Sequence, residues 1–441
     1  MAKDFYATRS TAWWKVAIAM IGSCLSGVTF VSVPGMVGTI GFGYLQMCMG
    51  FFLGYLVIAF VLTPLYFRLN VVSVYEYLAR RYGTASHKTG AWFFFISKML
   101  GASVRLFLMI ATLQLLLAGP AGIPFWVTVA VVVLLEWLYT FRKGVKAVIA
   151  LDIVKTLAML VSVGLCLALI AREVGAPDRS LMRVFYFDDV NHPQFFWKQL
   201  LGGLFTVVAS TGLDQDMMQR TLACKNVHDS QKNLMVSVVL QIAVISLFLL
   251  LGVYLYQFAA LHGLEAKGDA LFPAVSWSGL LPASGLVATL FIIGLVMAGF
   301  PAGGSALTAL TTSFTIDVLG GKDRYRTWIH SGMAVLMAAC ILVFNALNNT
   351  SVIDAVYRLA SYTYGPILGL FAFGLCCKAP VRDRWVPLVA VVAPLLCLLL
   401  DLNSVRWFGG YHFSYELLLM NAGFTVIGLC FLIRPRSWRK A

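Results

Sequence analysis

Charged residues are scarce in this chain. Asp, Glu, Lys and Arg together make up 12% of its 441 residues, which is about half of their share in a soluble globular domain. A protein of this size with so little charge lacks the side chains to cover a water-facing surface. The composition therefore excludes an ordinary water-soluble protein.

Recognisable enzyme motifs are missing as well. The sequence has no His and Cys residues at metal-ligand spacing, no phosphate-binding glycine loop in a strand–helix setting and no nucleophile elbow. Its nine cysteines lie in or beside apolar segments, apart from Cys224 in a loop assigned to the inner side. They predict no disulfide framework. We expect no enzymatic activity.

Long apolar runs take the place of charge. Hydrophobic residues make up 60% of the chain and the mean hydropathy is +0.85. Runs of about 20 apolar residues are long enough to cross a bilayer as helices, whereas β-barrel strands would alternate over about ten residues. We predict an all-α polytopic membrane protein with about twelve transmembrane helices. The candidate spans are 12–39, 43–67, 90–118, 123–141, 147–170, 196–218, 233–259, 284–318, 327–347, 352–377, 385–401 and 414–433.

Positive charge is distributed unevenly between the loops. The 33 Lys and Arg residues exceed the 19 acidic ones, and most of them fall in every second connection, where they would face the cytoplasm. This distribution explains the basic character of the chain without a nucleic-acid partner. We predict a bacterial inner-membrane protein with both termini in the cytoplasm, in contact with the lipid bilayer and without an obligate protein partner.

Two of the predicted spans contain helix-weakening residues at mid-depth. The first span carries Ser26, Thr29 and Pro34 among several glycines, and the sixth carries Ser210 and Gly212. One interpretation is close packing of helices through small residues. The other is a pair of broken helices, which marks the binding site in many transporters.

Ionisable residues inside the spans are further candidates for function. Arg105 lies about ten residues from the inner end of the third span, either reaching toward the membrane surface or facing a carboxylate. Asp152 and Lys155 share one face of the fifth span, as an ion pair or as a cation or proton site. Residues at the end of the sixth span predict an inner gate: Asp214, Gln215 and Arg220.

Six motifs occur together in a recognisable order. They are SGVTFVSVPG, YEYLARRYG, ALDIVKTLAML, TGLDQDMMQR, SALTALTTSFTIDVL and ASYTYGPILGLFAFG. In this order they resemble the sodium:solute symporter family, including its bacterial sugar, sialic acid and proline symporters. The resemblance implies one transmembrane transporter domain over 1–441 with a LeuT-like fold. Its 5+5 inverted repeat would cover about 12–377, and two additional C-terminal helices would cover about 385–433.

The resemblance also implies cation sites, and the sequence departs from them. The main sodium site would use the first break and the eighth core helix. Its positions are Gly22, Leu25, Ala298, Pro301 and Ala302. Pro301 and Ala302 stand where the family has hydroxyl ligands, and a hard cation needs several oxygens. A second cation site would use Asp152 and Ser305, with Lys155 at a position where the family usually has glutamine.

The resemblance predicts secondary active transport of a small organic solute by alternating access, with Na⁺ as the coupling ion and no other cofactor. Arg105 favours a carboxylated solute such as a sugar acid. The predicted solute-binding residues are Ser26, Thr29, Gln46, Arg105, Phe205 and Tyr362. Two alternatives stay open: sodium-independent or proton-coupled transport that uses Asp152 and Lys155, and a solute sensor that does not transport.

Overall fold

The computed structural model describes residues 11–70, 73–140, 145–281, 283–319, 323–347 and 352–434, without the side chains of 145–152, 155, 301, 316 and 353. This part of the chain is helical, with two isolated β-bridges, Thr11–Cys224 and Val381–Ile433, in place of strands. The helices are α1 Trp13–Cys24, α2 Gly27–Ile40, α3 Tyr44–Val57, α4 Thr63–Leu69, α5 Glu76–Arg81, α6 Thr84–Leu113, α7 Phe125–Thr140, α8 Val145–Val174, α9 Phe196–Val207, α10 Gln215–Thr221, α11 Val227–Leu261, α12 Leu271–Trp277, α13 Ser284–Ser313, α14 Arg326–Leu347, α15 Val352–Cys376, α16 Val386–Trp407 and α17 Leu417–Phe431.

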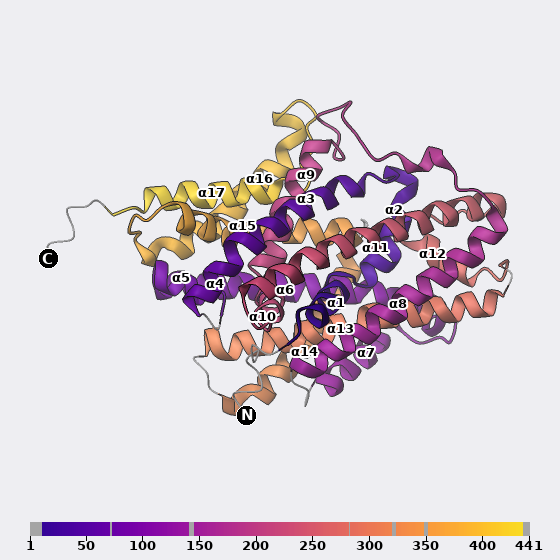
Figure 1. The fold of residues 1–441 in the computed structure, drawn as a ribbon, viewed down its shortest axis with the longest axis horizontal. Coiled ribbons are helices and arrows are strands. Elements are labelled where there is room, and N and C mark those ends of the chain that lie inside the picture. Colours follow the sequence, from indigo (N-terminus) through magenta and orange to yellow (C-terminus); the bar gives the residue numbers. More distant parts are fainter. Residues whose placement is uncertain are drawn as a thin grey trace.

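The helices form one elongated bundle (Figure 1). Among the described residues, eight helices are long and apolar enough to cross a membrane, or up to nine if the bent α1–α2 pair is one span. Each of the twelve predicted spans coincides with a helix or an interrupted helix. Helices α7 and α17 are shorter than a typical span, so the predicted number of twelve crossings stays a prediction.

The two ends of the bundle differ in their connections. At one end, Arg81, the last residue of α5, donates hydrogen bonds to the carbonyls of Cys377 and Ala379, near α4 and α5 at the left of Figure 1. At the other end, the amide of Phe42 donates to the Arg183 carbonyl at 2.8 Å. Following the distribution of charge, we call the first the inner end and the second the outer end.

Both predicted helix interruptions are present. Helix α1 ends at Cys24, α2 begins at Gly27, and the two are bent by 60°. In the sixth predicted span, α9 continues as a π-helical turn over Val208–Gly212, and helical structure stops at Leu213 before α10 begins. Single π-turns inside α-helices are frequent at functional sites. Gly202 and Gly203, which precede this interruption, lie within the regular helix α9.

Glycines bring α3 and α9 close together. A Cβ atom at Gly203 would lie 2.2 Å from the Met47 carbonyl oxygen, and one at Gly50 would lie 2.2 Å from the Leu200 carbonyl oxygen. Helices in membranes use small residues in this way because lipid tails supply no hydrophobic drive for helix association. The two glycines therefore hold the wall formed by α3 and α9 together.

Gly203→Ala is expected to destabilise the protein by about 1–3 kcal/mol, because the added methyl group collides with rigid backbone. Thermal unfolding of the purified protein measures the effect. Gly164→Ala is the matched control, since no atom of a neighbour lies within 4 Å of its Cβ position. Equal unfolding temperatures for Gly203→Ala and Gly164→Ala would contradict the close contact.

Candidate functional site

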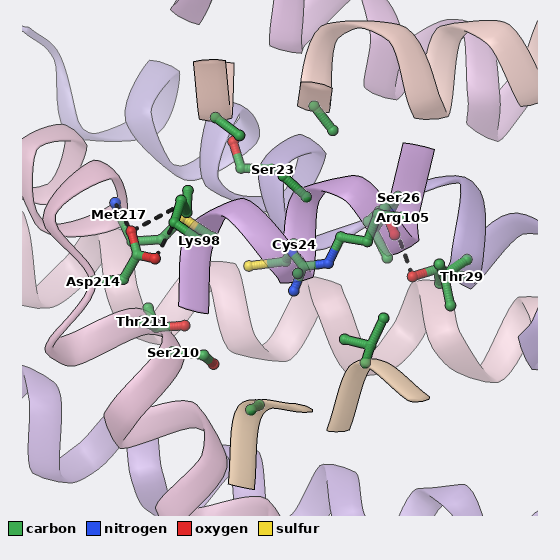
Figure 2. A pocket seen from close by; sticks show the side chains of 18 of the residues that line it. Ser23, Cys24, Ser26, Thr29, Lys98, Arg105, Ser210, Thr211, Asp214 and Met217 are labelled. Atoms are coloured by element: carbon green, nitrogen blue, oxygen red, sulfur yellow. Dashed lines mark hydrogen bonds and ion pairs between the residues drawn. The ribbon is translucent and has the colours of Figure 1, made fainter. Parts of the chain in front are cut away.

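A cavity of about 140 Å³ lies at the two helix interruptions. Its wall is made by residues from α1, α2, α3, α6, α9, α10, α11, α13 and α15 and by the interruptions themselves. The side chains in Figure 2 point into it from several of these elements. We call it the central cavity.

The break between α1 and α2 places polar groups in its wall. Ser23, Ser26 and Thr29 all line the central cavity, and the Ser26 amide donates to Thr29 Oγ1 at 3.4 Å. Interrupted backbone is tolerated at membrane depth where it faces protein or a wet cavity. The sequence of the first span thus produces a polar site within the bundle.

Arg105 extends from α6 into this cavity. In Figure 2 its side chain runs from beside Ser26 toward Cys24. It is half-buried, and within the described residues no hydrogen bond or ion pair to its guanidinium is found. A guanidinium presents a planar fork of donors that fits a carboxylate.

A network of charged residues closes the inner side of the cavity. Lys98 Nζ lies 3.2 Å from both oxygens of Asp214 and 3.1 Å from Asp216 Oδ2. Asp216 Oδ1 lies 3.4 Å from Arg220 Nη2, and the Arg220 guanidinium also donates to Ser23. Two cations and two carboxylates balance each other here, so Arg105 is an additional positive charge.

Asp214 organises this network. Its Oδ1 accepts from the amides of Asp216 at 2.9 Å and Met217 at 3.2 Å, which caps the N-terminus of α10. Its Oδ2 accepts from the Tyr364 hydroxyl at 2.9 Å. The side chain of Asp214 is only 2% exposed. The network therefore ties the interruption after α9 to α6 and α15.

The predicted solute-binding residues separate into two groups. Ser26, Thr29 and Arg105 line the central cavity. Gln46, Phe205 and Tyr362 do not line it.

Gln46 is engaged at the outer end. Its Oε1 accepts from the Tyr186 amide at 3.0 Å and its Nε2 donates to the Gln194 carbonyl at 3.0 Å. These bonds hold the loop before α9 against the start of α3. The side-chain amide of Gln46 is therefore hydrogen-bonded to the backbone of this loop.

Tyr362 faces the peripheral helices. Its hydroxyl donates to Asp401 Oδ2 at 2.6 Å, which joins α15 to α16. The cavity side of α15 is formed by Val356, Tyr357, Leu359, Ala360 and Tyr364. Tyr364, two residues further along the helix, points the other way and lines the cavity.

Phe205 packs as a half-buried residue against the hydrophobic core. Its neighbours Thr206 and Val207 line the cavity in its place.

The predicted cation-site residues are also divided. Leu25, Ala302 and Ser305 line the central cavity, whereas Gly22 and Ala298 lie outside its wall. Ser305 Oγ donates to the Ala302 carbonyl at 3.1 Å. The side chains of Asp152, Lys155 and Pro301 lie outside the described part of the structure.

Of the three predicted inner-gate residues, Asp214 and Arg220 belong to one network and Gln215 does not. Asp214 and Arg220 join through Asp216. Gln215 turns away, and its Oε1 accepts from the Val74 amide at 2.7 Å.

Two ionisable residues within spans were missed by sequence reasoning. Lys98 precedes Arg105 by two helical turns, so the helical period already indicates a shared face. Glu136 in α7 is fully buried. A Cβ at Gly303 or at Gly304 would lie 2.7 Å from one of its carboxylate oxygens, so this glycine pair leaves room for the carboxylate behind the cavity wall.

Comparison with known proteins agrees with this architecture. A solved sodium-coupled sialic acid symporter superposes with a TM-score of 0.77 at 17% identity, covering 98% of this chain and 91% of that one. The fold is therefore LeuT-like, as predicted. The sodium:solute symporter family matches residues 5–379, and the chain belongs to this family.

Two relatives show how far the similarity extends. The human sodium/iodide cotransporter is 23% identical over 89% of this chain. The mouse sodium-coupled monocarboxylate transporter 1 is 24% identical over 85% of it. The alignments span 66% and 64% of the length of these relatives, respectively.

Proposed function

We propose that this protein is a secondary active transporter that imports a small carboxylated solute by alternating access. The observation that carries the proposal is the Arg105 guanidinium in the central cavity, the one charge there that the neighbouring carboxylates do not balance among the described residues. A buried cation favours an anionic ligand that replaces its lost hydration. Both relatives carry anion names, iodide and monocarboxylate.

Ser26 and Thr29 would complete the solute site beside Arg105. Their hydroxyls suit a polyhydroxylated acid such as a sugar acid. The Lys98–Asp214–Asp216–Arg220 network would act as the inner gate, because opening the cavity toward the cytoplasm requires these buried ion pairs to separate. From the distribution of Lys and Arg, we place the protein in the bacterial plasma membrane with both termini in the cytoplasm.

Sodium is the proposed coupling ion, on the evidence of family membership. Leu25 and Ser305 line the central cavity and would offer a backbone carbonyl and a hydroxyl oxygen to the ion, while Ala302 has no side-chain ligand. The alternative is sodium-independent or proton-coupled transport, with Asp152 and Lys155 replacing the ion. The second alternative is a sensor that binds the solute without transporting it, because a sensor does not need an intact cation site.

Concentrative uptake of a carboxylated solute into proteoliposomes is expected to require an inward sodium gradient. The measurement compares uptake of labelled monocarboxylates and sugar acids with sodium or choline outside. Equal accumulation of the solute with choline outside would favour sodium-independent or proton-coupled transport over sodium coupling. Lys155→Ala would then be the next variant to measure. Binding without uptake in either salt would favour a sensor.

A further inference from the structure

A second cavity, of about 240 Å³, lies at the outer end. We call it the outer cavity. Its described lining includes no lysine or arginine, in contrast to the central cavity. The oxygen-bearing side chains that line it include Ser32, Thr39, Gln194, Asp269, Asp354 and Tyr415.

A pair of tyrosines stands between the two cavities. Tyr44 lines both of them, and its hydroxyl lies 2.5 Å from the hydroxyl of Tyr357, which lines the central cavity. The Tyr357 ring packs on the Tyr415 ring at 4.9 Å, and Tyr415 lines the outer cavity. The outer cavity is therefore separated from the solute site by aromatic side chains.

Two carboxylates give the outer cavity its charge. Asp269 Oδ2 accepts from the Val352 amide at 3.1 Å, and Asp354 Oδ1 accepts from the Tyr415 hydroxyl at 2.6 Å. Within the described residues, neither carboxylate is in an ion pair. Burial raises the pKa of Asp269, hydrogen bonds from Ser32 and the Val352 amide offset part of this rise, and the nearby charge of Asp354 adds to it.

A buried hydroxyl points to a missing ligand. Ser32 is 1% exposed, and its hydroxyl lies beside Asp269 and lowers the pKa of that carboxyl. No other hydrogen-bond partner of Ser32 Oγ is found among the described residues. Gln194 Oε1 also lacks a partner. Buried polar atoms normally have partners, because leaving one unpaired costs free energy. A bound cation would satisfy these oxygens and the two carboxylates together.

We propose that the outer cavity binds a monovalent cation, a metal ion or an organic ammonium, through the Asp269 and Asp354 carboxylates and the Ser32 hydroxyl. Hard cations prefer oxygen ligands. In the described residues, no cluster of three or more acidic, His or Cys side chains suited to a metal is found, so the charge fits a monovalent ion better than a divalent one. The volume far exceeds the ~10–15 Å³ that one water requires, so the cation can keep part of its hydration.

This proposal goes beyond the transport function, because it concerns a site outside the central cavity and needs no solute. Its test is direct binding of labelled sodium and of labelled tetramethylammonium to the purified full chain. The variant is Asp269→Asn with Asp354→Asn, whose amide oxygens can still accept the bonds from Val352 and Tyr415. Glu173→Gln removes an exposed carboxylate at the outer end of α8 and is the matched control.

We expect at least one of the two cations to bind at the outer cavity of the wild type and the control. The double variant should bind it there about tenfold more weakly or not at all, while any sodium at the central site is kept. Binding of sodium alone identifies a metal ion, and binding of tetramethylammonium identifies an organic cation. If the double variant fails to purify as a monodisperse protein, Asp354→Asn alone is measured in its place.

The proposal is overturned if neither cation binds the wild type, or if the double variant binds as many cations, and as tightly, as the wild type. Ser305→Ala distinguishes the outer cavity from the proposed central ion site, because it should leave binding at the outer cavity intact. Loss of all cation binding in Ser305→Ala alone would also assign the ion to the central site. Failure of solute uptake with cation binding preserved would count against the transport function only.

Discussion

Arg105→Gln is expected to weaken binding of a carboxylated solute by about 10- to 100-fold, the strongest effect we expect at the solute site. Hydrogen bonds to charged groups contribute about 1.5–3 kcal/mol, and each 1.4 kcal/mol is a factor of ten in affinity. Glutamine keeps a donor amide on a shorter side chain but removes the charge and the fork. Thermal shifts of the purified protein across a panel of monocarboxylates and sugar acids identify the ligand and measure its affinity.

Two comparisons make this result specific. Arg358→Gln is the matched control, because Arg358 is 60% exposed and lies 3.9 Å from Asp401, away from the central cavity. Arg105→Lys keeps the charge and should retain part of the affinity. If Arg105→Gln bound the solute as tightly as the wild type, the carboxylate would have to bind elsewhere. If both Arg105 variants failed to fold, Arg105 would have a structural role.

Lys98→Met is expected to destabilise the protein by about 3–5 kcal/mol, because it leaves a buried carboxylate without its cation. Asp214 is 2% exposed and Asp216 is 15% exposed, and Lys98 contacts both. Methionine keeps much of the length and packing of the lysine stem, so the loss reports on charge. Thermal or denaturant unfolding of the purified protein measures it.

A second substitution should rescue this variant. Asp216→Asn in the Lys98→Met background removes one of the two carboxylates, so Asp214 and Arg220 again balance in charge. The double variant should be more stable than Lys98→Met alone, which gives a positive coupling in a double-mutant cycle. If the effects of the two substitutions simply added, the contact between Lys98 and Asp216 would carry no energy.

The two cavities present opposite charges to a solute. The central cavity has one uncompensated cation, Arg105, while the outer cavity has two carboxylates, Asp269 and Asp354. An anion approaching from outside would be repelled until a cation occupied the outer cavity. The proposed sites therefore give a physical reason for solute entry to depend on a cation, separate from the energetic coupling of transport.

The sequence determined the class of protein and the place where its first span is interrupted. Long apolar runs require helices in a membrane, because unpaired backbone groups are too costly in lipid. Ser26 and Thr29 beside Pro34 indicated the first interruption, and the structure has it between Cys24 and Gly27. The position of Arg105 far from the inner end of its span indicated a functional charge. Each of these signals is local, since it depends on a residue and its neighbours along the chain.

The tertiary structure alone decided which polar groups meet. Lys98 and Asp214 are 116 positions apart, and Tyr44 and Tyr357 are 313 apart. Hydropathy indicates that a residue is in a span but not which way it faces among several helices, so it could not place Gln46 or Tyr362 relative to the central cavity. Their partners, a loop amide and Asp401, come from distant segments. Contacts of this kind arise from the packing of whole helices, which no local pattern encodes.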